Sequence, residues 1–219
     1  NNSLTKEAYY SNDELNSYRW ANTVKIMNPL SADLGVMRQT LVFGGLESLA
    51  RNINRKRENL RFFEVGNVYH YAPEKDDHDA PIKAYTQQYH LALWLTGKRV
   101  EGSWAHADED ASFYELKAYV INILHRAGLK QGVAVEEKTT NNLFAYGLTL
   151  KTRQGTKIAE YGKLAKKVAH ECGVEKDVFY AELNWTAIVK ATKKNKVEFK
   201  ELSKYPSVSR DLALLVDDN

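Results

Sequence analysis

The chain has 219 residues, of which 43% are hydrophobic and 27% are charged, which is ordinary globular composition and excludes large-scale disorder. Its net charge of +3 is too small to indicate nucleic-acid binding by itself. The single cysteine, Cys172, excludes an internal disulfide and favours a reducing compartment, and no apolar run approaches the length of a membrane span. We therefore expect a cytoplasmic protein without a membrane partner, and the missing initial Met predicts an internal piece of a longer chain.

The first half of the chain predicts a turn, a helix and two strands. Asn28 and Pro29 open a turn, because Pro fixes φ and Asn bonds locally. An amphipathic helix is expected to follow Gly44-Gly45, with its apolar positions at i, i+3, i+4 and i+7. Residues 61–71 predict a strand with a bulge at Gly66, and residues 72–88 predict a loop. Residues 89–96 alternate with two largely apolar faces, which indicates a central strand.

The second half predicts further helices among pairs of strands. Ser112 and Glu115 have capping-box spacing before an apolar stripe that ends near Gly128. Asn184 is expected to cap one more short helix. The remaining expected elements are a hairpin over 144–150 and 157–161, a helix over 164–172, and strands over 178–183, 197–202 and 212–216. This order favours an α+β fold, a mostly antiparallel sheet flanked by helices.

The search for chemistry in the sequence predicts no catalytic, cofactor-binding or metal-binding residue. Gly44-Gly45 lacks the Lys-Ser/Thr of a phosphate-cradling loop, so the start of a helix is the favoured reading. Residues 76–79 have the right types for weak binding of a hard cation, but successive side chains diverge in a loop, which favours solvation. Cys172 is expected at a helix C-terminus, where the macrodipole disfavours a thiolate, and we interpret it as structural.

Basic runs are the remaining candidates for contact with a partner. Phosphate contact is possible at each run, but a solvated helix face or turn is the favoured reading. The weak candidates for contact with tRNA or a protein partner are Arg55, Lys56, Arg57, Lys193 and Lys194.

Several ordered motifs resemble one family. Asn28-Pro29-Leu30-Ser31, then Met37-Arg38-Gln39-Thr40-Leu41, then Phe63-Glu64-Val65-Gly66, and finally Lys204-Tyr205-Pro206-Ser207-Val208-Ser209-Arg210-Asp211 occur in that order. Together they resemble the β subunit of bacterial phenylalanyl-tRNA synthetase. The residues that carry this signature, which we expect to be structural, are Asn28, Pro29, Arg38, Phe63, Glu64, Gly66, Pro206, Arg210 and Asp211.

The resemblance implies a degenerate class II aminoacyl-tRNA synthetase fold over residues 1–203. Residues 204–219 would then be a linker and the first strand of a truncated ferredoxin-like anticodon-binding domain. Class II chemistry needs an arginine on the motif-2 strands and a Gly-rich strand and helix ending in arginine. The sequence offers Asn67-Val68-Tyr69-His70 after Gly66 instead, and no Gly-x-Gly-x-Gly-x-x-Arg. Without these cations the triphosphate charge is poorly compensated, so the isolated chain is expected to be inert.

The resemblance also implies partners and function. The module would bind the catalytic α subunit in an (αβ)2 assembly and support the charging of tRNA-Phe with phenylalanine. ATP and magnesium would be cofactors of the whole enzyme and of no site in this chain. Two alternatives stay open, an RNA-binding module that uses the basic runs and a stand-alone adenylate-forming enzyme. Arg38 is expected to form a structural ion pair with Glu47, Glu64 or Asp33.

Overall fold

The computed structural model describes residues 3–11, 18, 20–29, 31, 34–129, 134–193, 195, 204–205 and 208–212. The helices are α1 (Ala8–Ser11), α2 (Val42–Ile53), α3 (Phe113–Arg126), α4 (Lys166–Glu171) and α5 (Trp185–Thr192), with 3-10 turns η1 (Trp20–Asn22), η3 (Pro73–Lys75) and η4 (Pro81–Ala84). The strands are β1 (Leu4–Thr5), β2 (Val36–Met37), β3 (Leu60–Tyr71), β4 (Tyr85–Thr96), β5 (Lys98–Val100), β6 (Glu109–Asp110), β7 (Ala134–Lys138), β8 (Phe144–Thr152), β9 (Lys157–Leu164) and β10 (Val178–Asn184).

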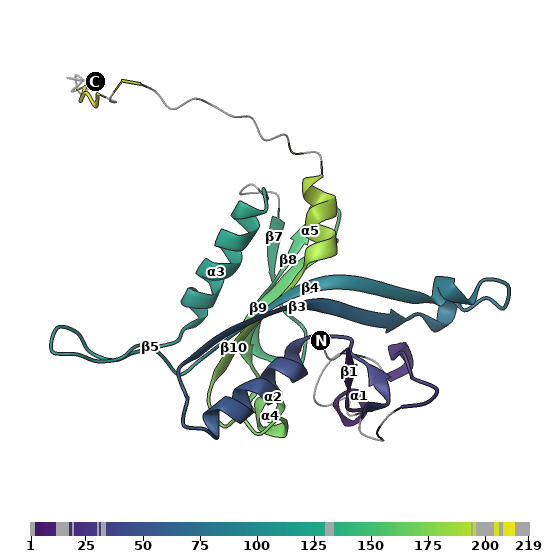
Figure 1. Ribbon diagram of the computed structural model, residues 1–219. Helices are drawn as coiled ribbons and strands as arrows, with labels where there is room; N and C mark the ends of the chain where they lie inside the picture. The colour runs from purple at the N-terminus through teal and green to yellow at the C-terminus, as the bar shows by residue number, and fades with distance from the viewer. Residues whose placement is uncertain are drawn as a thin grey trace, which may run out of the picture.

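Six of the strands form one antiparallel sheet in the order β3-β4-β10-β9-β8-β7. Helices α2 and α4 and the N-terminal segment lie on one face, while α3 and α5 lie on the other (Figure 1). Each face has its own apolar core, because the sheet alternates its side chains between the two sides. The expected α+β architecture with an antiparallel sheet is confirmed.

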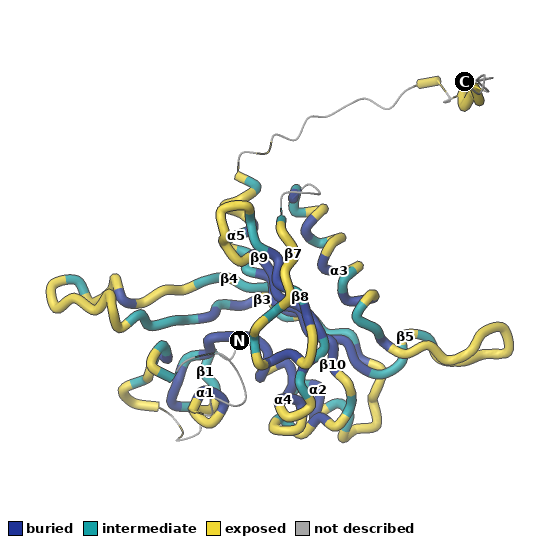
Figure 2. Tube along the Cα trace, turned by 180° about the vertical axis from the view of Figure 1, so that it is seen from behind, coloured by how far each residue is buried: buried dark blue, intermediate teal, exposed yellow. Residues whose placement is uncertain are grey.

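Two hairpins extend away from this body in opposite directions (Figure 1). One is the long β3–β4 pair, whose outer end carries η3 and η4. The other is the short β5–β6 pair, which leads into α3. Both hairpin ends are coloured mostly as exposed in Figure 2, in contrast to the buried centre of the sheet.

The helix ends agree with the capping signals in the sequence. The Ser112 side chain accepts a hydrogen bond from the Glu115 amide, and Asn184 does the same for the Ala187 amide. Gly128 has φ +90 after α3, as a C′ residue requires. Helix α2 begins at Val42, before Gly44-Gly45, so the expected start there is wrong. The reason is tertiary packing, since Val42 and Phe43 are buried.

Two further expectations need correction, and three strands were not expected. The β3–β4 register runs without interruption from Leu60 to Tyr71, so Gly66 is no bulge. The expected loop over 72–88 ends at Ala84, because Tyr85 already pairs with Tyr71. Strands β5, β6 and β7 were not predicted, because their exposed and charged residues show no apolar alternation. The strand expected over 197–202 lies outside the described residues, as does the strand expected over 212–216 except for Leu212, which is in no strand.

The core beneath α2 depends on one close approach. A Cβ on Gly45 would lie 2.1 Å from Trp94 Cε2, so only glycine lets the indole of the central strand pack against this helix. Trp94 is buried and also contacts the Tyr180 ring at 5.3 Å between centroids. This contact holds α2 against the centre of the sheet, next to the cavity described below.

Candidate functional site

A row of carboxylates crosses the α2 face of the sheet. Directly paired positions of antiparallel strands project to the same face. The register pairs Glu64 with Ala92, Ala92 with Glu182, Glu182 with Glu160, and Glu160 with Thr149. Thr149 is in turn paired with Glu137 on the edge strand β7. Four acidic side chains therefore lie on one line across this face, with Ala92 and Thr149 at the paired positions between them. They are here called the acidic row: Glu64, Glu182, Glu160 and Glu137.

Glu182 is the buried centre of the acidic row. Its carboxylate accepts hydrogen bonds from Thr40 Oγ1 at 2.5 Å, from the Tyr180 hydroxyl at 2.5 Å and from the Leu41 amide at 3.3 Å. His90 Nδ1 lies 2.7 Å away. Burial by itself would raise the pKa of this carboxyl, but the hydrogen bonds and the His90 charge outweigh it and lower the pKa to about 2. Glu182 is therefore a fixed anion at neutral pH.

Glu160 is held in the same way on the neighbouring strand. It accepts hydrogen bonds from the Thr139 hydroxyl and from Asn141 Nδ2, and Lys157 Nζ lies 2.7 Å from it. Burial would raise the pKa of Glu160, but Lys157 and these donors lower it. The second member of the acidic row is therefore also ionised at neutral pH.

The two outer carboxylates are each paired with a single cation. Glu64 pairs with Arg38 at 2.6 Å and Glu137 with Lys151 at 2.5 Å. The side chain of Arg38 is 8% exposed, whereas the Lys151 pair lies at the surface. Glu64, Glu137 and Glu160 are thus each paired with a cation within the protein, so no cation of these pairs is left over for an anionic ligand.

Arg38 forms the expected ion pair, and its contacts join the N-terminal segment to β3. Its Nε donates to the Asn67 carbonyl at 2.9 Å, and its own carbonyl accepts from the Tyr69 amide at 2.9 Å. Of the three candidate carboxylates, Glu64 is the partner. Glu47 instead accepts from the Tyr9 hydroxyl and pairs with Lys6, and Asp33 lies outside the described residues.

A cavity of about 320 Å³ opens beside the centre of the acidic row. Both Glu160 and Glu182 line it, and a second cavity of about 300 Å³ continues along Glu160 to Glu137. Within the described walls of the first cavity there is one lysine, Lys157, and no arginine. Burial, and then the nearby His90, lower the pKa of His70, so this lining imidazole adds no positive charge at neutral pH. The cavity disfavours a polyanion.

A larger hollow of about 790 Å³ lies at the base of the β5–β6 arm and carries no catalytic constellation. Its walls contain four basic and four acidic residues above an apolar floor. Two of these basic residues already form ion pairs with carboxylates of the protein, Lys176 with Glu58 and Lys98 with Asp108. The cavity over the acidic row, which two ionised carboxylates line, is therefore the better candidate for function, although it is smaller. Among the residues that the structure describes, no three metal-ligating side chains converge.

The basic candidates do not gather at the acidic row. Arg55, Lys56 and Arg57 follow α2, and Lys193 ends α5. These helix ends lie on opposite sides of the body, α2 at the bottom and α5 at the top of Figures 1 and 2. Lys194 lies outside the described residues. The described basic candidates therefore lie at two separate helix ends, and their contact with RNA stays a prediction.

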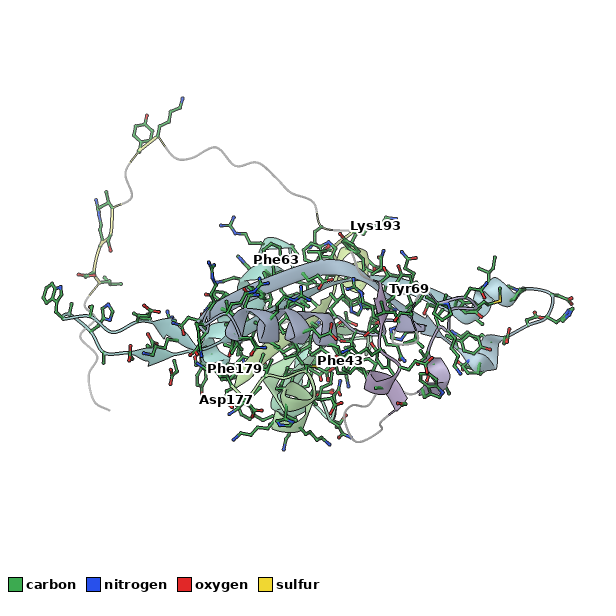
Figure 3. The ribbon with its side chains drawn as sticks, turned by 60° about the horizontal axis from the view of Figure 1, so that its bottom comes forward. Phe43, Phe63, Tyr69, Asp177, Phe179 and Lys193 are labelled. Atoms are coloured by element: carbon green, nitrogen blue, oxygen red, sulfur yellow. The ribbon has the colours of Figure 1, made fainter. Side chains whose placement is uncertain are left out.

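The signature residues fall into different environments. Glu64, Gly66 and Arg38 meet at one junction, whereas Asn28 and Pro29 are exposed in the N-terminal turn. Phe63, on the opposite face of β3, is 74% exposed (Figure 3). Arg210 and Asp211 are also exposed, and Pro206 lies outside the described residues.

The acidic row was missed in the sequence, although its signal is present. Each of Glu64, Glu160 and Glu182 stands in a strand between two apolar or aromatic residues, such as Phe63 and Val65. A charged residue at such a position is almost never buried without partners. The pattern could have identified three internal carboxylates, but their alignment in one row depends on strand order, which the sequence does not show.

Comparison with known proteins supports the motif-based resemblance. Residues 1–185 match the family described as phenylalanyl tRNA synthetase beta chain CLM domain. A phenylalanine–tRNA ligase beta subunit of Bacteroides fragilis is 51% identical over 217 residues, which are 99% of this chain and 26% of that protein. The protein of the same name from Bacteroides thetaiotaomicron is 49% identical over 100% of this chain, and that from Porphyromonas gingivalis is 40% identical over 99% of it. The matched region is 26% of each relative.

The chain thus spans about a quarter of the length of these relatives. No described helix is long and apolar enough to cross a membrane. The family match covers the six-stranded sheet, both helical layers and the start of α5, so it includes the whole acidic row. On these matches, the chain belongs to the phenylalanyl tRNA synthetase beta chain CLM domain family.

Proposed function

We propose that this chain is a non-catalytic structural module of a phenylalanine–tRNA ligase β subunit, with a degenerate class II synthetase fold. It binds the catalytic α subunit, in an (αβ)2 assembly in the cytoplasm, and so supports the charging of tRNA-Phe. ATP and magnesium act elsewhere in the whole enzyme. The observation that carries this proposal is the acidic row. It places carboxylates at the cavity over the sheet, where a nucleotide site would need cations.

The electrostatics of the cavity oppose nucleotide binding. A triphosphate in a partly desolvated site needs arginine, lysine or metal ions close to its charge. Glu182 and Glu160 instead present two ionised carboxylates to the cavity, and Lys157 is already bound to Glu160. Two like charges facing a polyanion add repulsion to the cost of desolvation. Adenylate formation at this position is therefore disfavoured.

Two strand segments that would carry cations in a catalytic class II site also support the proposal. The outer half of β3 holds no arginine, and Arg61 at its inner end is bound to Glu115 of α3 on the other face of the sheet. At the junction of β10 with α5 stand Asn184 and Trp185, and Asn184 is used as a helix cap. The stand-alone adenylate-forming enzyme is the weaker alternative for this reason.

Binding to the α subunit can be tested by mixing. The chain and a catalytic α subunit are combined, and the masses of the complexes are measured by gel filtration with light scattering. We expect co-elution that survives 500 mM salt, a condition that screens surface charges to a few ångströms. The RNA-binding alternative predicts the reverse, a complex with tRNA alone that dissociates in salt. If the chain forms no complex with the α subunit at micromolar concentration, the proposal is contradicted.

A further inference from the structure

The β5–β6 arm, defined here as residues 98–110, presents a single large aromatic side chain at its tip. Trp104 is 99% exposed, and every residue from 101 to 110 is exposed as well. The arm points away from the body (Figures 1 and 2). Burial of an indole ring contributes several kilocalories per mole of favourable free energy. An indole that is exposed at the end of an arm can therefore contribute strongly to the binding of a partner.

The tip of the arm is ordered although it lacks a core. The Ser103 amide donates to the His106 carbonyl at 2.9 Å, and the Ala105 amide donates to Ser103 Oγ at 3.2 Å. The Gly102 amide donates to Asp108 Oδ1 at 2.5 Å. These bonds fix the turn that carries Trp104. A rigid aromatic anchor loses little conformational entropy on binding, which is the property of interface hot spots.

The base of the arm is anchored to the body by one side chain. Asn59 Oδ1 accepts from the Lys98 amide at 2.8 Å, and its Nδ2 donates to Glu101 at 2.6 Å. Lys98 and Asp108 form a cross-strand pair at 2.7 Å, and Arg99 and Glu109 form another at 3.1 Å. A two-stranded hairpin is marginal alone, so these contacts explain how it keeps its direction.

The charge of the arm restricts what can bind it. It contains two basic residues, Lys98 and Arg99, and both are paired with carboxylates of the arm. It contains four acidic residues, so its net charge is −2 with His106 neutral. Stacking of Trp104 on a nucleotide base would bring phosphates towards this acidic surface, which costs electrostatic energy. The arm instead suits a protein pocket with an apolar floor and a basic rim.

We propose that the β5–β6 arm inserts Trp104 into an apolar, basic-rimmed pocket of the α subunit. This inference rests on the proposed function, which makes the α subunit the partner chain. The contact surface continues from the arm onto α3, which begins three residues after β6. Tyr114 and Ile121, at i and i+7 on that helix, are 79% and 37% exposed and share one face. The arm and this stripe together form a rigid docking surface.

Affinity measurements on the full-length β subunit test this role. Trp104→Ala should weaken the complex with the α subunit at least tenfold, measured by calorimetry in 150 mM salt, because a central tryptophan is a typical hot spot. The control is Ile82→Ala at the end of the β3–β4 hairpin, where the side chain is 84% exposed and the change should be within twofold. Neither side chain supports the fold, so the thermal midpoint of the free subunit should stay constant.

A photo-crosslinking amino acid at position 104 of the assembled ligase, with tRNA present, identifies what the tip touches. We expect a crosslink to an α-subunit peptide that contains apolar and basic residues. Crosslinks only to tRNA, to a second β subunit or to another part of the same subunit reject the arm proposal, as does a twofold or smaller effect of Trp104→Ala. Failure of the unaltered β subunit to bind the α subunit rejects the proposed function itself, so the two failures are distinguishable.

Discussion

Gly66 lies directly against the guanidinium of Arg38, so closely that a Cβ on Gly66 would come within 2.2 Å of Arg38 Nη2. The guanidinium is fixed there by Glu64 and by the Asn67 carbonyl. The Arg38 side chain therefore requires glycine at this position. The backbone does not, because it is ordinary strand with an uninterrupted register. The pair joins the N-terminal segment to β3 and supplies the charge that compensates the first member of the acidic row.

Gly66→Ala should displace Arg38 and break its ion pair with Glu64. We expect a loss of about 1–3 kcal/mol in the free energy of unfolding, measured by urea titration, since a nearly buried charge loses its partner. The control is Gly44→Ala on the exposed side of α2, where a new Cβ meets nothing within 4 Å. That change should stabilise the helix by about 0.5–1 kcal/mol.

The same clash predicts coupling between the two positions. In an Arg38→Ala background the obstacle is absent, so adding Gly66→Ala should cost much less than in the unaltered chain. A double-mutant cycle by urea unfolding should give a coupling of about 1 kcal/mol or more, as expected for residues in contact. Strict additivity would show that the crowding at Gly66 has another source.

Glu182→Gln should destabilise the protein in a pH-dependent way. Because the folded pKa of Glu182 is lowered from 4.5 to about 2, its ionised form stabilises the native state above pH 4.5. That contribution is lost as pH falls from 4.5 towards 2. We therefore expect a deficit of about 3 kcal/mol in unfolding free energy at pH 7, which shrinks steadily below pH 4.5. A deficit that is equal at pH 7 and pH 3 contradicts the ionisation assigned to Glu182.

Ser112→Ala should remove the cap of α3. The lost hydrogen bond to the Glu115 amide predicts a decrease of about 1 kcal/mol in stability by chemical denaturation. Ser112→Gly is the matched control, because glycine at an N-cap costs only a few tenths of a kcal/mol. Similar losses for the two variants would mean that the serine acts through contacts other than the cap.

The sequence predicted those helix ends and strands that are determined by their own residues, through capping side chains and apolar alternation. The caps Ser112 and Asn184 and the alternation in residues 89–96 belong to this class, and the structure confirms them. The ion pair of Arg38 is also confirmed, with Glu64 as a partner 26 positions away. Gly66 was misassigned as a bulge because the requirement for glycine comes from Arg38, a side chain 28 positions away in the chain. The start of α2 was likewise set by burial of Val42 and Phe43, which helix periodicity does not report.

The candidate site was less predictable than the fold. The sequence indicated a missing set of cations, and it could not show that carboxylates take their place. Glu64, Glu160 and Glu182 are separated by up to 118 positions and meet only because β10 lies between β4 and β9. Long-range strand order of this kind is decided by tertiary packing, whereas single-strand patterns constrain only the face on which a residue lies.

The number of nucleotide sites in the assembled ligase tests the central claim most directly. A non-hydrolysable phenylalanyl-adenylate analogue is titrated calorimetrically into the full α/β enzyme, into the β subunit alone, and into enzyme with Glu182→Gln. The proposed function predicts one bound analogue per α subunit, none for the β subunit alone, and no change of stoichiometry with Glu182→Gln. Saturable binding to the isolated β subunit, lost on altering the walls of the cavity beside Glu182, would contradict the account.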